Sequence, residues 1–195
     1  MRKKSHIALA KYLADSEGMS LLTAHKGAFC WGSILPDCVP SFVTRRHCIS
    51  DTFFILKKEL TLLIEHYDYS KGITGYFCRH LGIILHHVAD FFTYPHNSFY
   101  EGNLKQHCSY EEELKQYLKH YVSLPSARKQ RNAITEHCTV EHLCNTILHT
   151  HKQYAVGEHS IAHDTSFIIK ICHYIVDHIL AFAEQMICVP VAAAS

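Results

Sequence analysis

The spacing of apolar residues is the feature that most restricts how this chain can fold. Apolar side chains recur every three or four positions along most of the sequence, whereas the strict alternation typical of strands is scarce. Only 8 glycines and 5 prolines are present, so few residues interrupt long helices. We therefore expect an all-α protein with several helices in a single domain, residues 1–195. The expected helices cover residues 5–18, 21–35, 50–66, 72–92, 108–121, 139–154 and 160–188.

Hydroxyl residues and prolines suggest where these helices begin and end. Ser5, Ser50, Thr139 and Ser160 each precede an apolar periodic segment, and a hydroxyl side chain at that position can accept a hydrogen bond from a free backbone N–H group. Pro36 ends the second helix, because proline restricts the residue before it and cannot donate within a helix. Residues 37–48 are then expected to form a loop, and residues 94–97 a second stop and turn.

Composition limits the functional classes. The hydrophobic fraction is 48%, which is enough to build a buried core. Lys and Arg total 19 and Asp and Glu total 18, so the formal net charge of +1 argues against binding of nucleic acid through bulk electrostatics. No run of 18 uninterrupted apolar residues is present, so no transmembrane segment is expected.

The compartment is inferred from the N-terminus and from the cysteines. Charged residues soon interrupt the N-terminal segment, which therefore lacks the apolar core of a secretory signal. The nine cysteines include no C-x-x-C pair, and in such a chain reduced, partly buried thiols are the simplest expectation. We expect a cytoplasmic protein.

Histidine is unusually common, with 18 residues, and two spacings point to metal binding. His86 and Asp90 are four positions apart, so both side chains lie on one face of a helix and could chelate one metal ion. His87, three positions before Asp90, could compete with His86 by spacing alone. His96 lies just beyond the same helix, where Pro95 fixes the direction of the chain.

A second pair follows on the next expected helix. His107 and Glu111 again place an imidazole and a carboxylate four positions apart. One H-x-x-x-D pattern is weak evidence, because a solvated histidine beside a surface acid is common. Two such pairs on consecutive helices, with a histidine between them, are far more specific.

This ordered series resembles the zinc-dependent phospholipase C family, which includes the clostridial alpha-toxin catalytic domain and is related to fungal single-strand nucleases. The resemblance covers about residues 5–121. Residues 31–37, Trp-Gly-Ser-Ile-Leu-Pro-Asp, look like the family's Pro-Asp segment, and His47 stands in the place of a further histidine ligand. Ser5-His6 looks like the family's motif at the start of the first helix.

The resemblance implies an all-helical fold that holds a dinuclear or trinuclear zinc site between helices. The first ion would be bound by Asp37, His47, His86 and Asp90. The second would be bound by His96, His107 and Glu111, and the third by His6 and the bridging Asp90. Asp37 is also the candidate catalytic residue, to orient or deprotonate the attacking water. Ser41, Asp51 and Tyr110 are candidates to hold the imidazoles in place.

One departure concerns the third ion. In secreted family members the processed N-terminal residue, usually Trp, supplies its amino and carbonyl groups to this ion. Here a helix that begins at Ser5 leaves residues 1–4 as a short basic arm, in which Met1 matches the required position poorly. The third site could be empty, weak or completed by another ligand, and His25 is the candidate substitute.

The implied function is a zinc-dependent hydrolase of phosphate esters, a phospholipase C-like phosphodiesterase that uses a metal-activated hydroxide. Its substrate could be a phospholipid or a soluble phosphate ester. A nuclease-like phosphodiesterase is the alternative enzyme. A non-catalytic metal-binding protein that kept the ligands is the alternative from another class, and a closed coordination shell would distinguish it.

Overall fold

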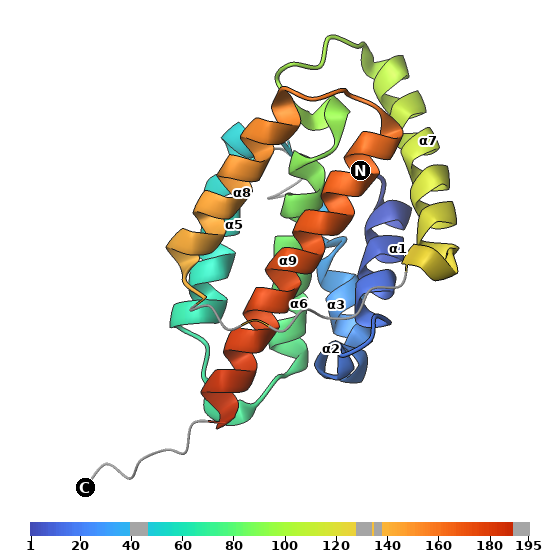
Figure 1. Cartoon of the computed structure of the whole chain (residues 1–195). Helices are drawn as coiled ribbons and strands as arrows, with labels where there is room; N and C mark the ends of the chain where they lie inside the picture. Colours follow the sequence, from blue (N-terminus) through green and yellow to red (C-terminus); the bar gives the residue numbers. More distant parts are fainter. Residues whose placement is uncertain (40–46, 128–133, 135–137, 189–195) are drawn as a thin grey trace, which may run out of the picture.

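The described fold is entirely helical. The computed structural model describes residues 1–39, 47–127, 134 and 138–188, and this part contains eight α-helices, four short 3-10 helices and no strand (Figure 1). The α-helices are α1 (Lys3–Ala14), α2 (Ser20–Ala24), α3 (Lys26–Gly32), α5 (Ile49–Glu65), α6 (Gly75–Phe91), α7 (Leu104–Ser123), α8 (Val140–Ala155) and α9 (Ile161–Cys188). The 3-10 helices are η1 (Leu35–Asp37), η2 (Tyr69–Lys71), η3 (Tyr94–His96) and η4 (Pro125–Ala127).

Helix α6 is the centre of the bundle. It packs against α1, α3, α5 and α9, and every residue from Leu81 to Phe91 is buried. A helix that is buried on all sides is normally apolar all round. Three polar residues of α6, His86, His87 and Asp90, are nevertheless fully inaccessible to solvent. Their burial is costly unless the surrounding elements supply partners for them.

Helix α9 forms the other long element of the core. It runs across α6 in Figure 1 and buries side chains along most of its length. Within the described residues, α9 is the one helix long and apolar enough to cross a membrane, but 78% of its most apolar window is buried inside the protein. That degree of burial is typical of a core helix.

Two glycines allow α3 and α6 to approach closely. A Cβ atom at Gly32 would lie 2.0 Å from the carbonyl oxygen of Arg79, and one at Gly82 would lie 2.3 Å from the carbonyl oxygen of Phe29. The backbones therefore touch where any larger residue would force them apart. This contact places η1, which carries Asp37, beside the ligand-bearing part of α6.

The predicted helices are present, but several boundaries differ from those expected. Ser5 is not an N-cap: α1 already begins at Lys3, and the Ser5 side chain is buried within it. The expected helix over residues 21–35 is divided at His25 into α2 and α3. Ser50 lies inside α5, whose N-cap is Cys48.

The start of α7 also differs from the prediction. Asn103 and Gln106 form a reciprocal capping box, so the helix begins at Leu104 and includes His107. Phe54, an apolar residue of α5, is 56% exposed. The nine cysteines are all free thiols.

The close approach of α3 and α6 can be tested with two glycines of the same helix. Gly32→Ala should lower the free energy of unfolding by about 1–3 kcal/mol, because the added methyl group collides with backbone that cannot rotate away. Gly27→Ala should raise it by about 0.4–1 kcal/mol, because a Cβ atom there meets nothing within 4 Å and the unfolded chain loses freedom. Urea unfolding measures both changes, and equal effects of the two substitutions would contradict the packing described.

Candidate metal centre

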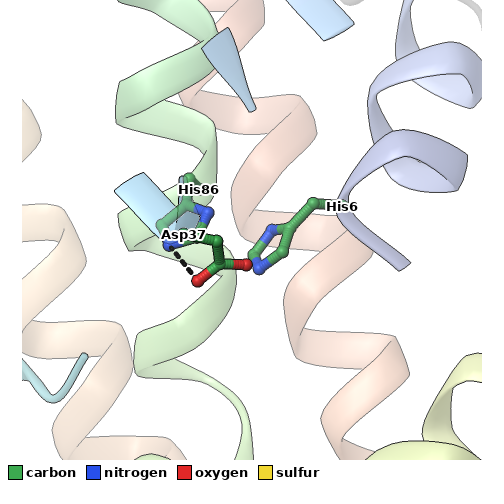
Figure 2. A group of neighbouring side chains, drawn as sticks. All are labelled: His6, Asp37 and His86. Atoms are coloured by element: carbon green, nitrogen blue, oxygen red, sulfur yellow. Dashed lines mark ion pairs between the residues drawn. The ribbon is translucent and has the colours of Figure 1, made fainter. Parts of the chain in front are cut away.

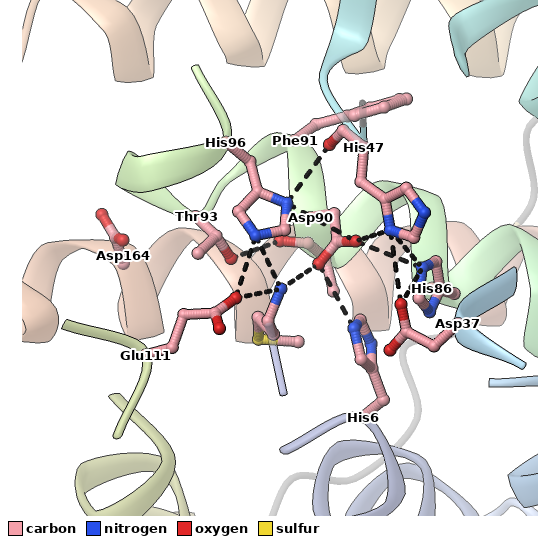
Figure 3. Close-up of polar contacts among 12 residues, drawn as sticks. His6, Asp37, His47, His86, Asp90, Phe91, Thr93, His96, Glu111 and Asp164 are labelled. Carbon is pink, nitrogen blue, oxygen red and sulfur yellow. Dashed lines mark hydrogen bonds and ion pairs between the residues drawn. The ribbon is translucent and has the colours of Figure 1, made fainter. Parts of the chain in front are cut away.

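The side chains singled out in the sequence come together around the C-terminal half of α6. They arrive from α1, η1, the segment before α5, α6 itself, η3 and α7. Figure 3 shows most of them converging on Asp90 from different elements. The complete set is His6, Asp37, His47, His86, Asp90, His96, His107 and Glu111.

Asp90 lies at the middle of this cluster. One carboxylate oxygen, Oδ2, lies 3.0 Å from His47 Nδ1 and 3.2 Å from His86 Nε2. The other, Oδ1, lies 3.2 Å from His6 Nε2. Both oxygens therefore face nitrogen atoms, on opposite sides of a fully buried carboxylate. A carboxylate with this surrounding could bridge two metal ions.

Three groups within the cluster have the compactness of metal sites. In each group one possible ligand atom per residue lies within 4.8 Å of the others. The groups are His47–His86–Asp90, His6–Asp37–His86 and His96–His107–Glu111. Figure 2 shows the second group, in which the Asp37 carboxylate lies beside the rings of His6 and His86, which stack with their centroids 4.1 Å apart.

Backbone carbonyl groups orient two of the imidazoles. The Nδ1 atom of His86 lies 3.0 Å from the carbonyl oxygen of Ser33, and that of His96 lies 3.3 Å from the carbonyl oxygen of His47. Each Nδ1–H can donate to its carbonyl group, which leaves Nε2 unprotonated and facing the cluster. The sequence did not predict that Ser33 orients His86, because its carbonyl group reaches the imidazole only through the close approach of α3 and α6.

The third group combines α7 with the turn after α6. The Oε1 atom of Glu111 lies 3.0 Å from His96 Nε2 and 3.4 Å from His107 Nε2. The His107 side chain is 30% exposed and that of Glu111 is 15% exposed. This side of the cluster therefore reaches the protein surface, whereas His6, His86 and Asp90 are sealed from it.

The N-terminal amino group lies in the cluster, contrary to the expectation that Met1 matches this position poorly. Its nitrogen lies 2.5 Å from Asp90 Oδ1, 3.3 Å from Glu111 Oε1 and 3.1 Å from His96 Nε2. The early start of α1 at Lys3 directs the chain inward instead of leaving a free arm. Arg2 secures this path through the carbonyl group of Cys108 and through Glu112.

The charges of the cluster shift the pKa values of its members. Burial alone would raise the pKa of Asp90, but the Met1 amino group and the imidazoles outweigh it and hold that pKa well below its ordinary value. Burial and the neighbouring His86 lower the pKa of His6 to about 3. The hydrogen bond to Asp90 raises the pKa of His47. At neutral pH the buried carboxylate is therefore charged and His6 is neutral.

These residues fit a zinc ion by their chemistry. The donors are imidazole nitrogens and carboxylate oxygens, the mixture used in catalytic rather than structural zinc sites. The Nδ1 atom of His6 is buried without a hydrogen bond to any described residue, and its Nε2 atom faces only the carboxylate of Asp90, at 3.2 Å. A buried imidazole nitrogen without a partner is costly unless another group, such as a metal ion, uses its lone pair.

The comparison with known families agrees with this geometry. The model of the family described as zinc-dependent phospholipase C matches residues 5–161. The chain belongs to the zinc-dependent phospholipase C family. The match extends well past residue 121, where the recognisable motifs end, and takes in α8. No curated protein and no solved structure matches the chain.

Other candidates from the sequence lie elsewhere. His25 lies 3.1 Å from the carbonyl oxygen of Ile73, at the α2–α3 junction, and belongs to none of the three groups. His86 rather than His87 enters the groups, and the His87 ring stacks at 6.4 Å on Phe91. Tyr110 donates to Asp164 and not to an imidazole.

The roles of two further candidates for holding the imidazoles, Ser41 and Asp51, stay predictions. Ser41 lies outside the described residues. The Asp51 carboxylate accepts a hydrogen bond from Ser50, at the exposed start of α5.

The lowered histidine pKa values predict acid sensitivity of the chelator-treated protein. Burial lowers the pKa of His6, His87 and His96, so the unfolded chain binds more protons than the folded one below about pH 6.5. Stability should therefore fall as the pH is lowered from 7 to 5, by up to about 1.4 kcal/mol per pH unit for each such histidine, and the raised pKa of His47 offsets only part of this loss. Urea unfolding at the two pH values measures this change. Equal or greater stability at pH 5 would contradict the assignment.

Proposed function

We propose that this family member is a zinc-dependent phosphodiesterase of the phospholipase C type, with two or three ions held by the cluster around Asp90. The observation that carries the proposal is the convergence of three compact N/O ligand groups on one buried carboxylate, in a chain that the family model matches. When bound, zinc is a Lewis acid that acidifies water and neutralises charge on phosphate oxygens.

The chain's own residues would supply positioning and electrostatics. His47, His86 and Asp90 would hold one ion, and His96, His107 and Glu111 a second. His6, with Asp37 and the bridging Asp90, would contribute to a third. Because His6, His86 and Asp90 are fully buried, their positions are fixed by packing before substrate binds, which lowers the cost of reorganisation.

Asp37 is our candidate for handling the proton of the attacking water. Its Oδ1 atom lies 3.5 Å from His47 Nδ1 and 3.9 Å from His86 Nε2, and its side chain is 18% exposed. It is therefore next to the ligand groups and is reached by solvent. A carboxylate in this position could accept a hydrogen bond from water and hold it for attack on phosphorus.

The partial exposure of Asp37, Glu111 and His107 helps to distinguish an enzyme from a non-catalytic metal-binding protein. A non-catalytic metal site is expected to be closed to solvent. Here solvent reaches Asp37 in one ligand group, and His107 and Glu111 in another. The family to which the chain belongs favours a phospholipid ester over a nucleic acid as substrate. The near-neutral charge gives no independent support to a nuclease.

A substrate panel tests this proposal. The zinc-loaded protein should release diglyceride from phosphatidylcholine in mixed micelles and should hydrolyse a bis-aryl phosphodiester, with little action on single-stranded DNA. His86→Ala and Asp90→Asn should each lower turnover more than about 100-fold, because loss of even a ligand's partner typically costs about 10–100-fold. Asp37→Asn should lower kcat with little change in KM, as expected of a group that acts on the water.

His80→Ala is the matched control, because His80 also lies on α6 but pairs with Glu59, outside the cluster. Its turnover should stay close to that of the unaltered protein. Turnover that survives Asp90→Asn, or that survives complete removal of metal by a chelator, would refute the proposal. Cleavage of single-stranded DNA alone would support the nuclease alternative instead.

A further inference from the structure

A fully buried carboxylate that belongs to none of the ligand groups lies beside the metal centre. Asp164, in the first turn of α9, is inaccessible to solvent and accepts three hydrogen bonds. The backbone N–H of Tyr94 donates to Oδ2 at 2.8 Å, the hydroxyl of Tyr110 to Oδ2 at 2.8 Å, and the hydroxyl of Tyr154 to Oδ1 at 2.7 Å. Figure 3 shows Asp164 on the Glu111 side of the cluster.

The donors connect Asp164 to the elements that carry two ligands. Tyr94 is the first residue of η3, in which His96 is the last. Tyr110 directly precedes Glu111 in α7. Tyr154 lies near the end of α8 and anchors the carboxylate from the opposite side, with a side chain that is itself fully buried. One carboxylate thus joins α7, α8, α9 and the turn after α6.

A hydrogen bond to the backbone N–H of Tyr94 fixes the path of the chain and not merely one side chain. The same turn is fastened from its other end by Asn97, whose side-chain amide donates to the carbonyl oxygens of Phe91 and Thr93. Asn97 thus donates to carbonyl groups of the turn, whereas Asp164 accepts from its backbone N–H group at Tyr94. Without Asp164, the Tyr94 N–H and the two hydroxyl groups would lose a charged acceptor in a buried place, which is costly.

We propose that Asp164 is a positioning residue for the His96–His107–Glu111 group: its carboxylate fixes the turn that carries His96 against the helix that carries Glu111. The proposal deepens the proposed function, on which it rests. Asp164 lies beyond residue 161, where the family match ends. Residues that orient metal ligands typically contribute about 10–100-fold to metal affinity, although they do not touch the ion.

The test is a zinc titration of the full-length, chelator-treated protein against a competing chelator of known affinity. Asp164→Asn keeps the shape of the side chain but removes its charge and one acceptor oxygen. It should weaken one class of bound zinc by about 10–100-fold and leave the others within about twofold. Tyr110→Phe, which removes a single donor and keeps the carboxylate, should weaken the same class by less. Tyr110→Phe also tests the proposal if the Asp164→Asn variant fails to fold.

Two matched variants assign the effect. His107→Ala removes a ligand of the affected group. Adding Asp164→Asn to this variant should therefore not change the zinc affinities of the remaining sites. Thr165→Val is the control for disturbance of α9, because Thr165 is the buried neighbour of Asp164 and its hydroxyl has no hydrogen bond to a described residue. It should leave every zinc affinity unchanged.

Several results would overturn the proposal. They are unchanged affinities in Asp164→Asn, an equal loss in all classes of bound zinc, or a loss that persists in the His107→Ala background. Hydrogen exchange of the Tyr94 amide in the chelator-treated protein gives an independent reading, and it should be faster in Asp164→Asn than in Thr165→Val. This reading separates the two hypotheses: an unaltered protein that binds no zinc would refute the proposed function, while unchanged Tyr94 exchange would refute the role of Asp164.

Discussion

The buried carboxylate of Asp90 is the interaction on which the rest of the site depends. It lies at 0% exposure in the part of α6, Leu81 to Phe91, in which every residue is buried, and an isolated charge there would cost far more than a small domain can supply. The fold meets this cost by directing an amino group and several imidazoles at it from the N-terminus, α1, the segment before α5 and η3. The early start of α1 brings the Met1 amino group to Asp90, and the η3 turn brings His96. The close approach of α3 lets the Ser33 carbonyl group orient His86.

Local sequence patterns predicted the parts of the site that lie on single helices. His86 with Asp90, and His107 with Glu111, are each four residues apart, so helix geometry alone places them on one face. The all-helical fold was likewise predictable, because a period of three to four residues recurs along the chain. The relation of these pairs to each other came from the family resemblance and not from spacing.

The contacts that sequence reasoning missed are those made between distant elements. The inward path of Met1 follows from the start of α1 at Lys3, which no capping side chain marks. The carbonyl group of Ser33 reaches His86 only because Gly32 and Gly82 let two backbones touch. Asp164 meets Tyr94 across 70 residues, and nothing in its local sequence distinguishes it from a surface acid at the start of a helix.

The central claim is that zinc ions occupy the cluster around Asp90. The most direct measurement is a crystal structure of the zinc-loaded protein with anomalous diffraction collected at the zinc absorption edge. Two or three peaks are expected among the side chains of the cluster, at about 2.0–2.2 Å from ligand nitrogen and oxygen atoms. The expected ligands are His6, Asp37, His47, His86, Asp90, His96, His107 and Glu111. A map with no peak in this cluster, or with peaks only at surface histidines, would contradict it.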